Sequence, residues 1–361
     1  MNGKRIQTTH RAILILSVVF CVCVTSSGVM ASEQEQKSGI VYMISLLPTP
    51  YRMEEQNHYH SLLKQYRDFK KTSISDAKLK IGFTHEKLPV LKNQYELDKI
   101  AGNGDDLSKA LNLLFWLCDH TYHKGDYDNH IPMNSLDLLE YSFDKGRANG
   151  VNCLNLSVIL TECLLSIGLP AHTVGLMPFS HEDMDNHVVV HVHIASLGKW
   201  MMLDPSWCSY FSDEEGNILD IFEIRNRFAD DEEVHLNEEF SYCGVKLISF
   251  PEMVRHYKQY MAKDLFYFTV TEISTFGRDA NGGKFFVCPE NFNHVEALIK
   301  KLEYNLNMAG TLEGLDESFK SKAIESLTKQ LERLNNLIDS NDGTLEETLP
   351  CLSPEDFLAA P

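Results

Sequence analysis

The segment from Gly150 to Pro170 constrains the fold of this 361-residue chain more than any other part of it. Its residues are apolar on nearly every face of a helix, and such a helix is normally buried. Asn152 is a good N-cap residue, and Gly168 followed by Pro170 is a typical helix end. The sequence therefore predicts a core helix with Cys153 in its first turn, where the positive end of the helix dipole favours a thiolate.

The first 31 residues have the features of a secretory signal peptide. A basic start precedes an apolar run from Ala12 to Val24, and Val29 and Ala31 fit a small-residue cleavage site. The run is shorter than the roughly 20 residues that span a bilayer, although membrane anchoring through an uncleaved signal that extends to Ala31 stays open. We expect an exported protein that is secreted, or held at the cell surface if the signal is not cleaved.

The charge balance of the exported part is strongly acidic. Cleavage would remove three basic and no acidic residues, and the formal net charge would change from −18 to −21. Nucleic-acid binding depends on Lys and Arg side chains that neutralise phosphates, so we expect no nucleic-acid partner. The remaining cysteines are odd in number and scattered, which excludes a small disulfide-rich fold but allows one or two bridges beside a free thiol.

Changes in composition and periodicity divide the chain into five parts. We expect a signal peptide over 1–31, an N-terminal extension over 32–104, a core over 105–245, a C-terminal α/β extension over 246–345 and a tail over 346–361. Apart from the Cys153 helix, helical spacing is found in Tyr51–Lys71, Leu107–His123, Leu136–Phe143, Phe250–Leu265, Asn293–Met308 and Glu317–Asp339. A hairpin is expected from 266–276 and 284–288, and a loosely ordered end from Gly343.

After Pro170 the period changes from helical to alternating. His187–Ile194 alternates strictly, with its even-numbered residues on one face and His187 on the other. A Gly-containing turn leads to a second strand, Trp200–Asp204, so the two strands form an antiparallel hairpin. Asp204 then lies opposite a residue between 187 and 191, and a carboxylate and an imidazole become cross-strand neighbours.

Cys153, His187 and Asp204 have the order and the secondary-structure context of a Cys-His-Asp triad. In such a triad the thiolate attacks an acyl carbon, the imidazole holds and returns the proton, and the carboxylate orients the imidazole. The backbone N–H of Cys153 is a natural donor to the oxyanion. For a second donor we consider three side chains, those of Asn149, Asn152 and Tyr141.

Residues of about 105–210 resemble the transglutaminase-like superfamily, especially its secreted microbial branch. The family pattern is a cysteine helix that ends in Gly-Ile-Pro-Ala, followed by His-Ala-Trp, a strand, Gly-x-Trp and Asp-Pro-Thr. The matching segments here are Leu107–His123, Asn134–Tyr141, Lys145–Cys153, Leu164–Ala171, His187–Val190 and Gly198–Ser206. Val188 and Val189 stand where the family has Ala-Trp, and the turn between the strands is about two residues longer than usual.

The resemblance implies an α+β fold with a papain-like core, in which the nucleophile lies at the N-terminus of a buried helix packed on an antiparallel sheet. A helical C-terminal extension would follow this catalytic core. The resemblance also implies acyl transfer through a thioester on a protein or peptide substrate, with amine transfer, deamidation or hydrolysis as the outcome. We expect no cofactor and no metal, and no calcium loop is recognised in the sequence.

Several residues near the triad have a structural and a functional interpretation. His191 and Trp207 are expected near the substrate cleft, and a tighter turn would place His191 rather than His187 opposite Asp204. A zinc site on His191, His193 and a third ligand, His172 or Asp204, is an alternative. Cys163 is expected in the core, and the acidic loop Met177–Asn186 is either a solvated loop or a gate.

The leading hypothesis is an exported cysteine enzyme of the transglutaminase-like type that hydrolyses peptide or amide bonds rather than cross-linking them. Cys153 would be the nucleophile, His187 the general base and acid, and Asp204 the orienting group. One alternative is a catalytically inactive module that uses the same cleft to bind a peptide or a component of the cell envelope. Another is a metallohydrolase built on His191 and His193.

Overall fold

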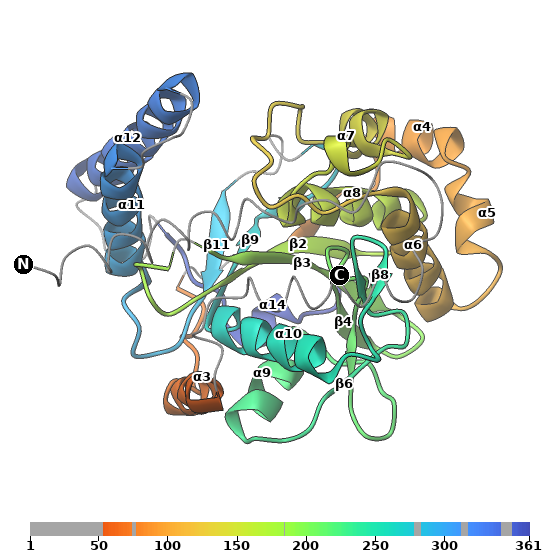
Figure 1. Ribbon diagram of the computed structural model, residues 1–361, viewed down its shortest axis with the longest axis horizontal. Coiled ribbons are helices and arrows are strands. Elements are labelled where there is room, and N and C mark those ends of the chain that lie inside the picture. Colours follow the sequence, from red (N-terminus) through yellow and green to blue (C-terminus); the bar gives the residue numbers. More distant parts are fainter. Residues whose placement is uncertain (1–52, 74–76, 184, 278–282, 312–316, 341–348) are drawn as a thin grey trace, which may run out of the picture.

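The computed structural model describes residues 53–73, 77–183, 185–277, 283–311, 317–340 and 349–361. Its fold is mixed α+β, as expected, and its centre is an antiparallel five-stranded sheet in the order β11-β9-β2-β3-β4 (Figure 1). The strands are β2 (Ala171–Met177), β3 (His187–Ile194), β4 (Lys199–Leu203), β9 (Tyr267–Thr271) and β11 (Lys284–Val287). The hairpin expected from 266–276 and 284–288 is confirmed, and its two strands extend the same sheet as β2–β4.

One face of the sheet is covered by the helix that carries Cys153. This helix, α8, packs with four others to form an apolar cluster that includes Val190, Val192 and Ile194 of β3. The alternation expected in β3 is thus confirmed. The helices are α4 (Lys87–Gln94), α5 (Leu97–Ala101), α6 (Asp106–His120), α7 (Ser135–Ser142) and α8 (Cys153–Ser166).

The other face of the sheet is covered by segments that are far apart in the sequence. Val189 of β3 faces this side, where it belongs to a second apolar cluster with Tyr257, Phe268 and Phe357. Both faces of β3 are therefore buried. The helices on this side are α3 (Met53–Gln65), α9 (Ile221–Ala229), α10 (Pro251–Asp264) and α14 (Pro354–Phe357) (Figure 1).

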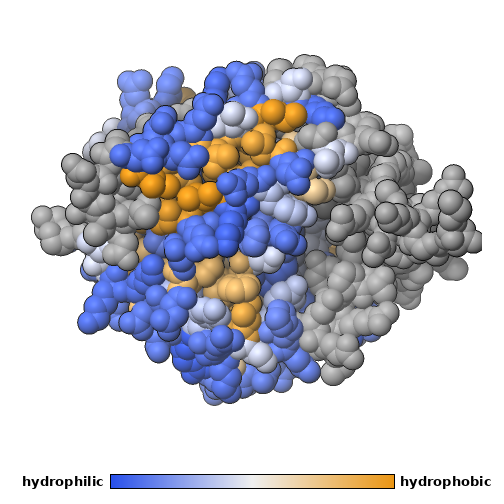
Figure 2. All heavy atoms as spheres, turned by 90° about the vertical axis from the view of Figure 1, so that its left-hand side faces the viewer, coloured by the Kyte–Doolittle hydropathy of each residue, from blue (hydrophilic) through white to orange (hydrophobic). Residues whose placement is uncertain are grey.

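Two long helices and several short elements complete the fold. The long helices α11 (His294–Thr311) and α12 (Glu317–Ser340) pack on each other beside the β11 edge of the sheet (Figure 1). On the face that carries them, a band of apolar side chains is bordered by hydrophilic ones (Figure 2). The short elements are β1 (Lys80–Ile81) paired with β10 (Ile273–Ser274), β5 (Phe211–Ser212) with β6 (His235–Leu236), β7 (Ser241–Tyr242) with β8 (Val245–Lys246), and the 3₁₀ turn η1 (Arg147–Asn149).

Local sequence signals predict most helices, but some of their ends differ from the expected positions by one to three residues. The expected helix 107–123 ends at His120, and the helix expected to be capped by Ser135 is capped one residue earlier, because the Asn134 side chain accepts from the Asp137 N–H. Sequence reasoning missed α9, although Asp220 and Glu223 form a capping box at its start.

The expectation of a loosely ordered chain end is wrong for residues 349–361. Cys351, Leu352 and Phe357 are buried, and α14 packs into the second apolar cluster, on the face of the sheet opposite α8 (below the sheet in Figure 1). The composition of a short segment does not show whether other parts of the chain form an apolar surface on which it packs. Here that surface is made by α9 and the central strands.

The proposed signal peptide, 1–31, and the residues that follow it up to 52 lie outside the described part of the chain. Among the described residues, none of the helices has the length and apolar character needed to cross a membrane.

Candidate functional site

The three residues of the proposed triad come together at one end of the central hairpin. Cys153 is the first residue of α8 and is half-buried, while His187 is the first residue of β3 and Asp204 directly follows β4. The Nε2 atom of His187 lies 2.6 Å from Oδ2 of Asp204. Both His187 and Asp204 are buried, and the Cys153 side chain lies close enough to His187 to raise the pKa of the imidazole. Because Nε2 is taken by Asp204, Nδ1 is left to face the thiol.

The sheet register sets Asp204 diagonal to both His187 and His191, and the carboxylate of Asp204 bonds to His187. Val190 pairs with Leu203 and His191 pairs with Met202, so the next position in the register sets Asp204 opposite Val189. His187 and Val189 share a face of the strand, and Asp204 is then a diagonal neighbour of His187. A backbone bridge to Ser209 in both directions fixes Asp204 just beyond the strand end.

The buried pair changes the proton affinity of both partners. Burial alone would lower the pKa of His187, but the Asp204 carboxylate and the Cys153 side chain outweigh it, so this pKa lies well above its usual value. Burial would likewise raise the pKa of Asp204, but the neighbouring His187 charge and hydrogen bonds hold it below its usual value. The arrangement therefore favours an imidazolium held between a carboxylate and the sulfur of Cys153.

Asp204 is held by a network that sequence reasoning missed. The Tyr257 hydroxyl, on α10, donates to Oδ2 of Asp204 at 2.7 Å, and the Ser206 N–H donates to Oδ1 at 2.9 Å. The Ser209 hydroxyl in turn donates to the Tyr257 oxygen at 2.8 Å. The Asp-Pro-Ser segment indicated where the carboxylate lies, but nothing in the sequence near it pointed to a tyrosine some fifty residues later.

We expect Tyr257→Phe to weaken both the fold and the site. The change removes one donor to a buried carboxylate and leaves the Ser209 hydroxyl without its acceptor, which costs about 1–3 kcal/mol in the free energy of unfolding. The pKa of Asp204 should rise, because it loses a hydrogen bond that favours its charged form. Chemical denaturation and the pH profile of Cys153 alkylation measure the two effects. Tyr260→Phe, on the same helix, is the control, and equal effects of both variants would contradict the assignment.

Two further rings lie close to His187. The ring of Tyr260 meets that of His187 edge-to-face at 5.2 Å between centroids, and its position on α10 covers the imidazole from below the sheet. His123, just beyond α6, has a pKa lowered to about 4, chiefly by burial and also by the positive charge of His187. A neutral His123 bonded to the Tyr242 hydroxyl at 2.8 Å adds no competing cation near the triad.

The backbone N–H of Cys153, expected from the sequence to be an oxyanion donor, lies at the start of α8. The first N–H groups of a helix lack intrahelical acceptors, and Cys153 occupies the first helical position. The Asn152 side chain caps the helix by accepting from the Asn155 N–H, and its amide donates to Asn129 at 3.1 Å. Asn152 is thus committed to holding the loop. Gly150 has to be glycine, because a Cβ there would meet the Tyr122 carbonyl at 3.0 Å and Lys124 Cβ at 2.9 Å.

The other two residues considered as oxyanion donors have different surroundings. Asn149 is half-buried at the end of η1, in the turn that leads into α8. The Tyr141 ring packs between two rings of the loop before α7, with centroid distances of 5.7 Å to Tyr127 and 5.2 Å to His130. Asn149 therefore stays the nearer of the two to Cys153 along the chain.

The structure places the two expected cleft residues in the core below the sheet. Trp207 is 9% exposed, and its ring packs on Tyr242 at 4.5 Å and on Tyr257 at 5.0 Å between centroids. It therefore contacts the tyrosine that bonds to Asp204. His191 does not line a cleft, because its ring is fully buried between Trp200 and Phe357, each 5.4 Å away. The helix α14 covers it, and no signal near His191 indicated that cover.

A cavity of about 630 Å³ begins beside the triad. It is lined by α8, the strands β2, β9 and β11, and α12. Leu154, which follows Cys153, and Asn186, which precedes His187, belong to its wall, as do Gly175 and Leu334. A peptide bound at Cys153 would lie on the same side of the sheet as this cavity.

The acidic segment between β2 and β3 is tied to α10. Asp183 and Asp185 lie 3.0 and 3.7 Å from Nζ of Lys263, which is 6% exposed. Lys263 also lies 3.1 Å from the buried carboxylate of Asp264, whose pKa is raised to about 7, mainly by burial. The segment leads directly into His187, so these contacts hold the approach to the triad.

Lys263→Met should release the acidic segment. Without the cation, the carboxylates of Asp183, Asp185 and Asp264 repel one another, and breaking a buried pair is strongly destabilising. We expect amide hydrogen exchange in the residues between β2 and β3 to speed up by about tenfold or more relative to α8. Lys258→Met, on the same helix, is the control. Unchanged exchange in this segment would show that the ion pairs do not hold it.

The zinc site considered on His191 and His193 is not formed. Across the described ranges, the metal-ligating side chains that gather closely enough to share one ion are Cys288, His294 and Cys351, which lie elsewhere. Comparison of the chain with family models, with curated proteins and with solved structures gives no match in any of the three.

Proposed function

We propose that this chain is an exported cysteine-dependent acyl-transfer enzyme with a papain-like, transglutaminase-like core, and that it acts on peptide or amide substrates. The observation that carries the proposal is the buried His187–Asp204 pair beside the half-buried Cys153 at a helix N-terminus. The order of these residues along the chain, and the helix and strands that present them, support the same family resemblance.

The proposed reaction uses the three side chains in sequence. The Cys153 thiolate attacks the substrate carbonyl carbon, and the backbone N–H of Cys153 stabilises the oxyanion. The His187 imidazolium gives its Nδ1 proton to the leaving amine as the C–N bond breaks, which leaves a thioester on Cys153. His187 then takes a proton from the incoming water or amine, and the thiolate leaves as the product forms. Asp204 keeps the ring oriented and stabilises the imidazolium in the proton-holding steps.

Hydrolysis is the outcome we favour. Cys153 is half-buried rather than fully buried, so water has access to the thioester carbon. The acceptor is tested directly by adding a peptide amide with and without hydroxylamine or a fluorescent primary amine. Free acid as the main product without added amine supports hydrolysis. Dominant incorporation of the fluorescent amine would support cross-linking instead.

The triad itself is tested by alkylation of Cys153 with iodoacetamide between pH 5 and 9. We expect alkylation at neutral pH to be much faster than that of a model thiol, and His187→Ala to remove the difference. Alkylation at the rate of a model thiol in both proteins would remove the proposed nucleophile. Rapid alkylation together with peptide binding, but no turnover of any peptide library, would select the inactive binding module.

A further inference from the structure

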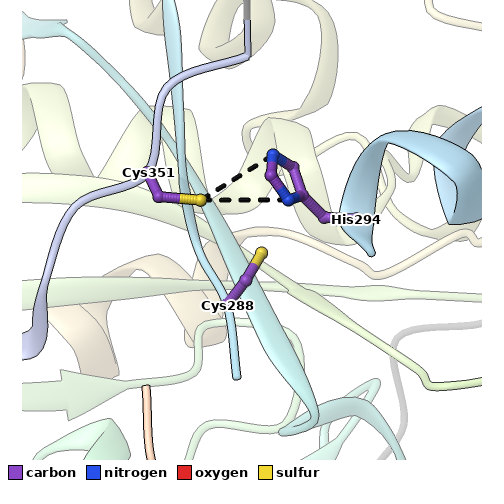
Figure 3. A group of neighbouring side chains, drawn as sticks. All are labelled: Cys288, His294 and Cys351. Atoms are coloured by element: carbon purple, nitrogen blue, oxygen red, sulfur yellow. Dashed lines mark hydrogen bonds between the residues drawn. The ribbon is translucent and has the colours of Figure 1, made fainter. Parts of the chain in front are cut away.

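A second group of reactive side chains lies at the far edge of the sheet from the hairpin β3–β4. Cys288 follows β11, His294 begins α11, and Cys351 lies in the segment before α14. All three are buried, with 0–1% of each side chain exposed. Their ligand atoms lie within 4.8 Å of one another, and the three side chains point to a common centre (Figure 3).

The spacing of these atoms suits a tetrahedral metal ion. Zn–S bonds of about 2.3 Å and Zn–N bonds of about 2.0 Å put neighbouring ligands about 3.5–3.8 Å apart in a tetrahedron. Sγ of Cys351 lies 3.9 Å from Nδ1 and 3.7 Å from Nε2 of His294. The donor set, two thiols and one imidazole, is the soft type that selects zinc among common ions.

The hydrogen bonds of His294 prepare one nitrogen for a metal. Nε2 lies 2.9 Å from the carbonyl oxygen of Leu349, which can only accept, so Nε2 carries the proton. Nδ1 then carries the lone pair, which accepts from Nζ of Lys70 at 3.5 Å, and a bound ion would take the place of that contact. Metal-bound histidines typically donate their other N–H to a carbonyl or carboxylate in this way. Two thiolates and one dication form a neutral centre, so the Lys70 charge does not oppose binding.

A peptide cannot reach these buried groups, but an ion there would join three separate segments. The segment that holds Cys351 runs beside β11, where the Phe286 N–H donates to Pro350 at 2.9 Å and the Leu352 N–H to Phe286 at 2.8 Å. Further on, the Leu358 carbonyl accepts from the Trp200 indole at 3.1 Å, and α14 covers β3. The chain end thus connects Cys351 to the hairpin that carries His187 and Asp204.

We propose that Cys288, His294 and Cys351 bind one zinc ion, which fastens the C-terminal segment to the sheet. The two cysteines bind as thiolates and release two protons, and His294 binds through Nδ1. Three protein ligands leave one tetrahedral position, which water can take. The site is independent of the proposed catalytic function, because it shares no residue with the triad.

The test begins with the wild-type full chain, kept reduced and stripped of metal by a chelator. Titration with Zn²⁺ should give one zinc per chain by mass spectrometry of the metal, with release of about two protons. Free Zn²⁺ at about a hundred times its Kd should raise Tm by about 5 °C. Titration with Co²⁺ should give a thiolate-to-cobalt charge-transfer band. These measurements need no variant, so they stand even where a variant does not fold.

Variants then assign the ligands. Cys351→Ser and His294→Gln should each weaken zinc binding by at least about a hundredfold, and Cys351→Ser should also weaken the charge-transfer band, because it removes one of the two thiolates. Cys153→Ser should keep one zinc per chain, as should His193→Gln on β3. Absence of stoichiometric zinc in the wild-type chain would overturn the proposal. So would a Cys288–Cys351 disulfide in the freshly purified protein, seen as a linked peptide lighter by two hydrogens.

Discussion

Cys153→Ala should abolish turnover of peptide and amide substrates while the protein stays folded. The sulfur is the atom that forms the covalent intermediate, and loss of a nucleophile that acts with a general base costs on the order of 10⁵-fold to 10⁶-fold in kcat. The side chain is half-buried at the first position of α8. Its truncation therefore leaves no large cavity, and Tm should change little. Steady-state kinetics on a responsive peptide, with a thermal melt of each variant, measures both expectations.

The matched control is Cys163→Ala, ten positions further along the same helix. Cys163 is fully buried in the apolar cluster on the α8 side of the sheet, so its truncation should lower Tm but keep turnover. A double variant, Cys153→Ala with His187→Ala, should be no slower than Cys153→Ala alone, because residues of one catalytic unit do not contribute additively. Equal losses of activity in Cys163→Ala and Cys153→Ala would show that the effect is structural.

The parts of the fold that could be predicted are those whose signals are local. The N-cap Asn152 and the apolar surface of α8 place Cys153 at a helix start. Gly168 ends the same helix with a positive φ of 86°. Strict alternation predicts β3 and the Gly-containing turn predicts its partner β4, and together these set Asp204 opposite a residue between 187 and 191. The three proposed catalytic residues therefore meet as the spacing indicated, although their catalytic role stays a prediction.

The parts that could not be predicted depend on segments that meet only in the folded chain. Tyr257 and Lys263 come from α10, which reaches the triad by packing below the sheet. His191 is on the same strand face as His187, but α14 from the chain end covers it. Alternation shows that two residues share a face, and it does not show which part of that face another helix will bury. The Cys288–His294–Cys351 group was missed for the same reason.

Asp204→Asn should lower both activity and stability, and the loss of stability should depend on pH. Turnover should fall by about 10⁴-fold, because the ring loses its orienting carboxylate and the imidazolium loses its counter-charge. Near pH 6 the free energy of unfolding should fall by about 3 kcal/mol, since removing one partner of a buried pair leaves the other uncompensated. Urea denaturation at several pH values, with kinetics at each, gives both quantities.

The sign of the pH dependence follows from the two pKa shifts. The folded-state pKa of His187 is raised, so its contribution to stability is complete below its unfolded value of about 6.5 and is lost as pH rises through the folded value. The folded-state pKa of Asp204 is lowered, so its contribution is complete above about 3.9 and is lost as pH falls through the folded value. The wild-type advantage over Asp204→Asn should therefore be greatest between about pH 4 and 6.5.

Above the folded-state pKa of His187 the difference between wild type and Asp204→Asn should shrink, because a neutral imidazole needs no counter-charge. The control is Asp119→Asn, the same change at an exposed position on α6, which should alter neither turnover nor the pH dependence. A difference in unfolding free energy that grows from pH 6 to pH 9 would mean that His187 is neutral in the folded protein. In that case the Cys153 sulfur would have no imidazolium partner at neutral pH, and its reactivity would rest on the helix N-terminus alone.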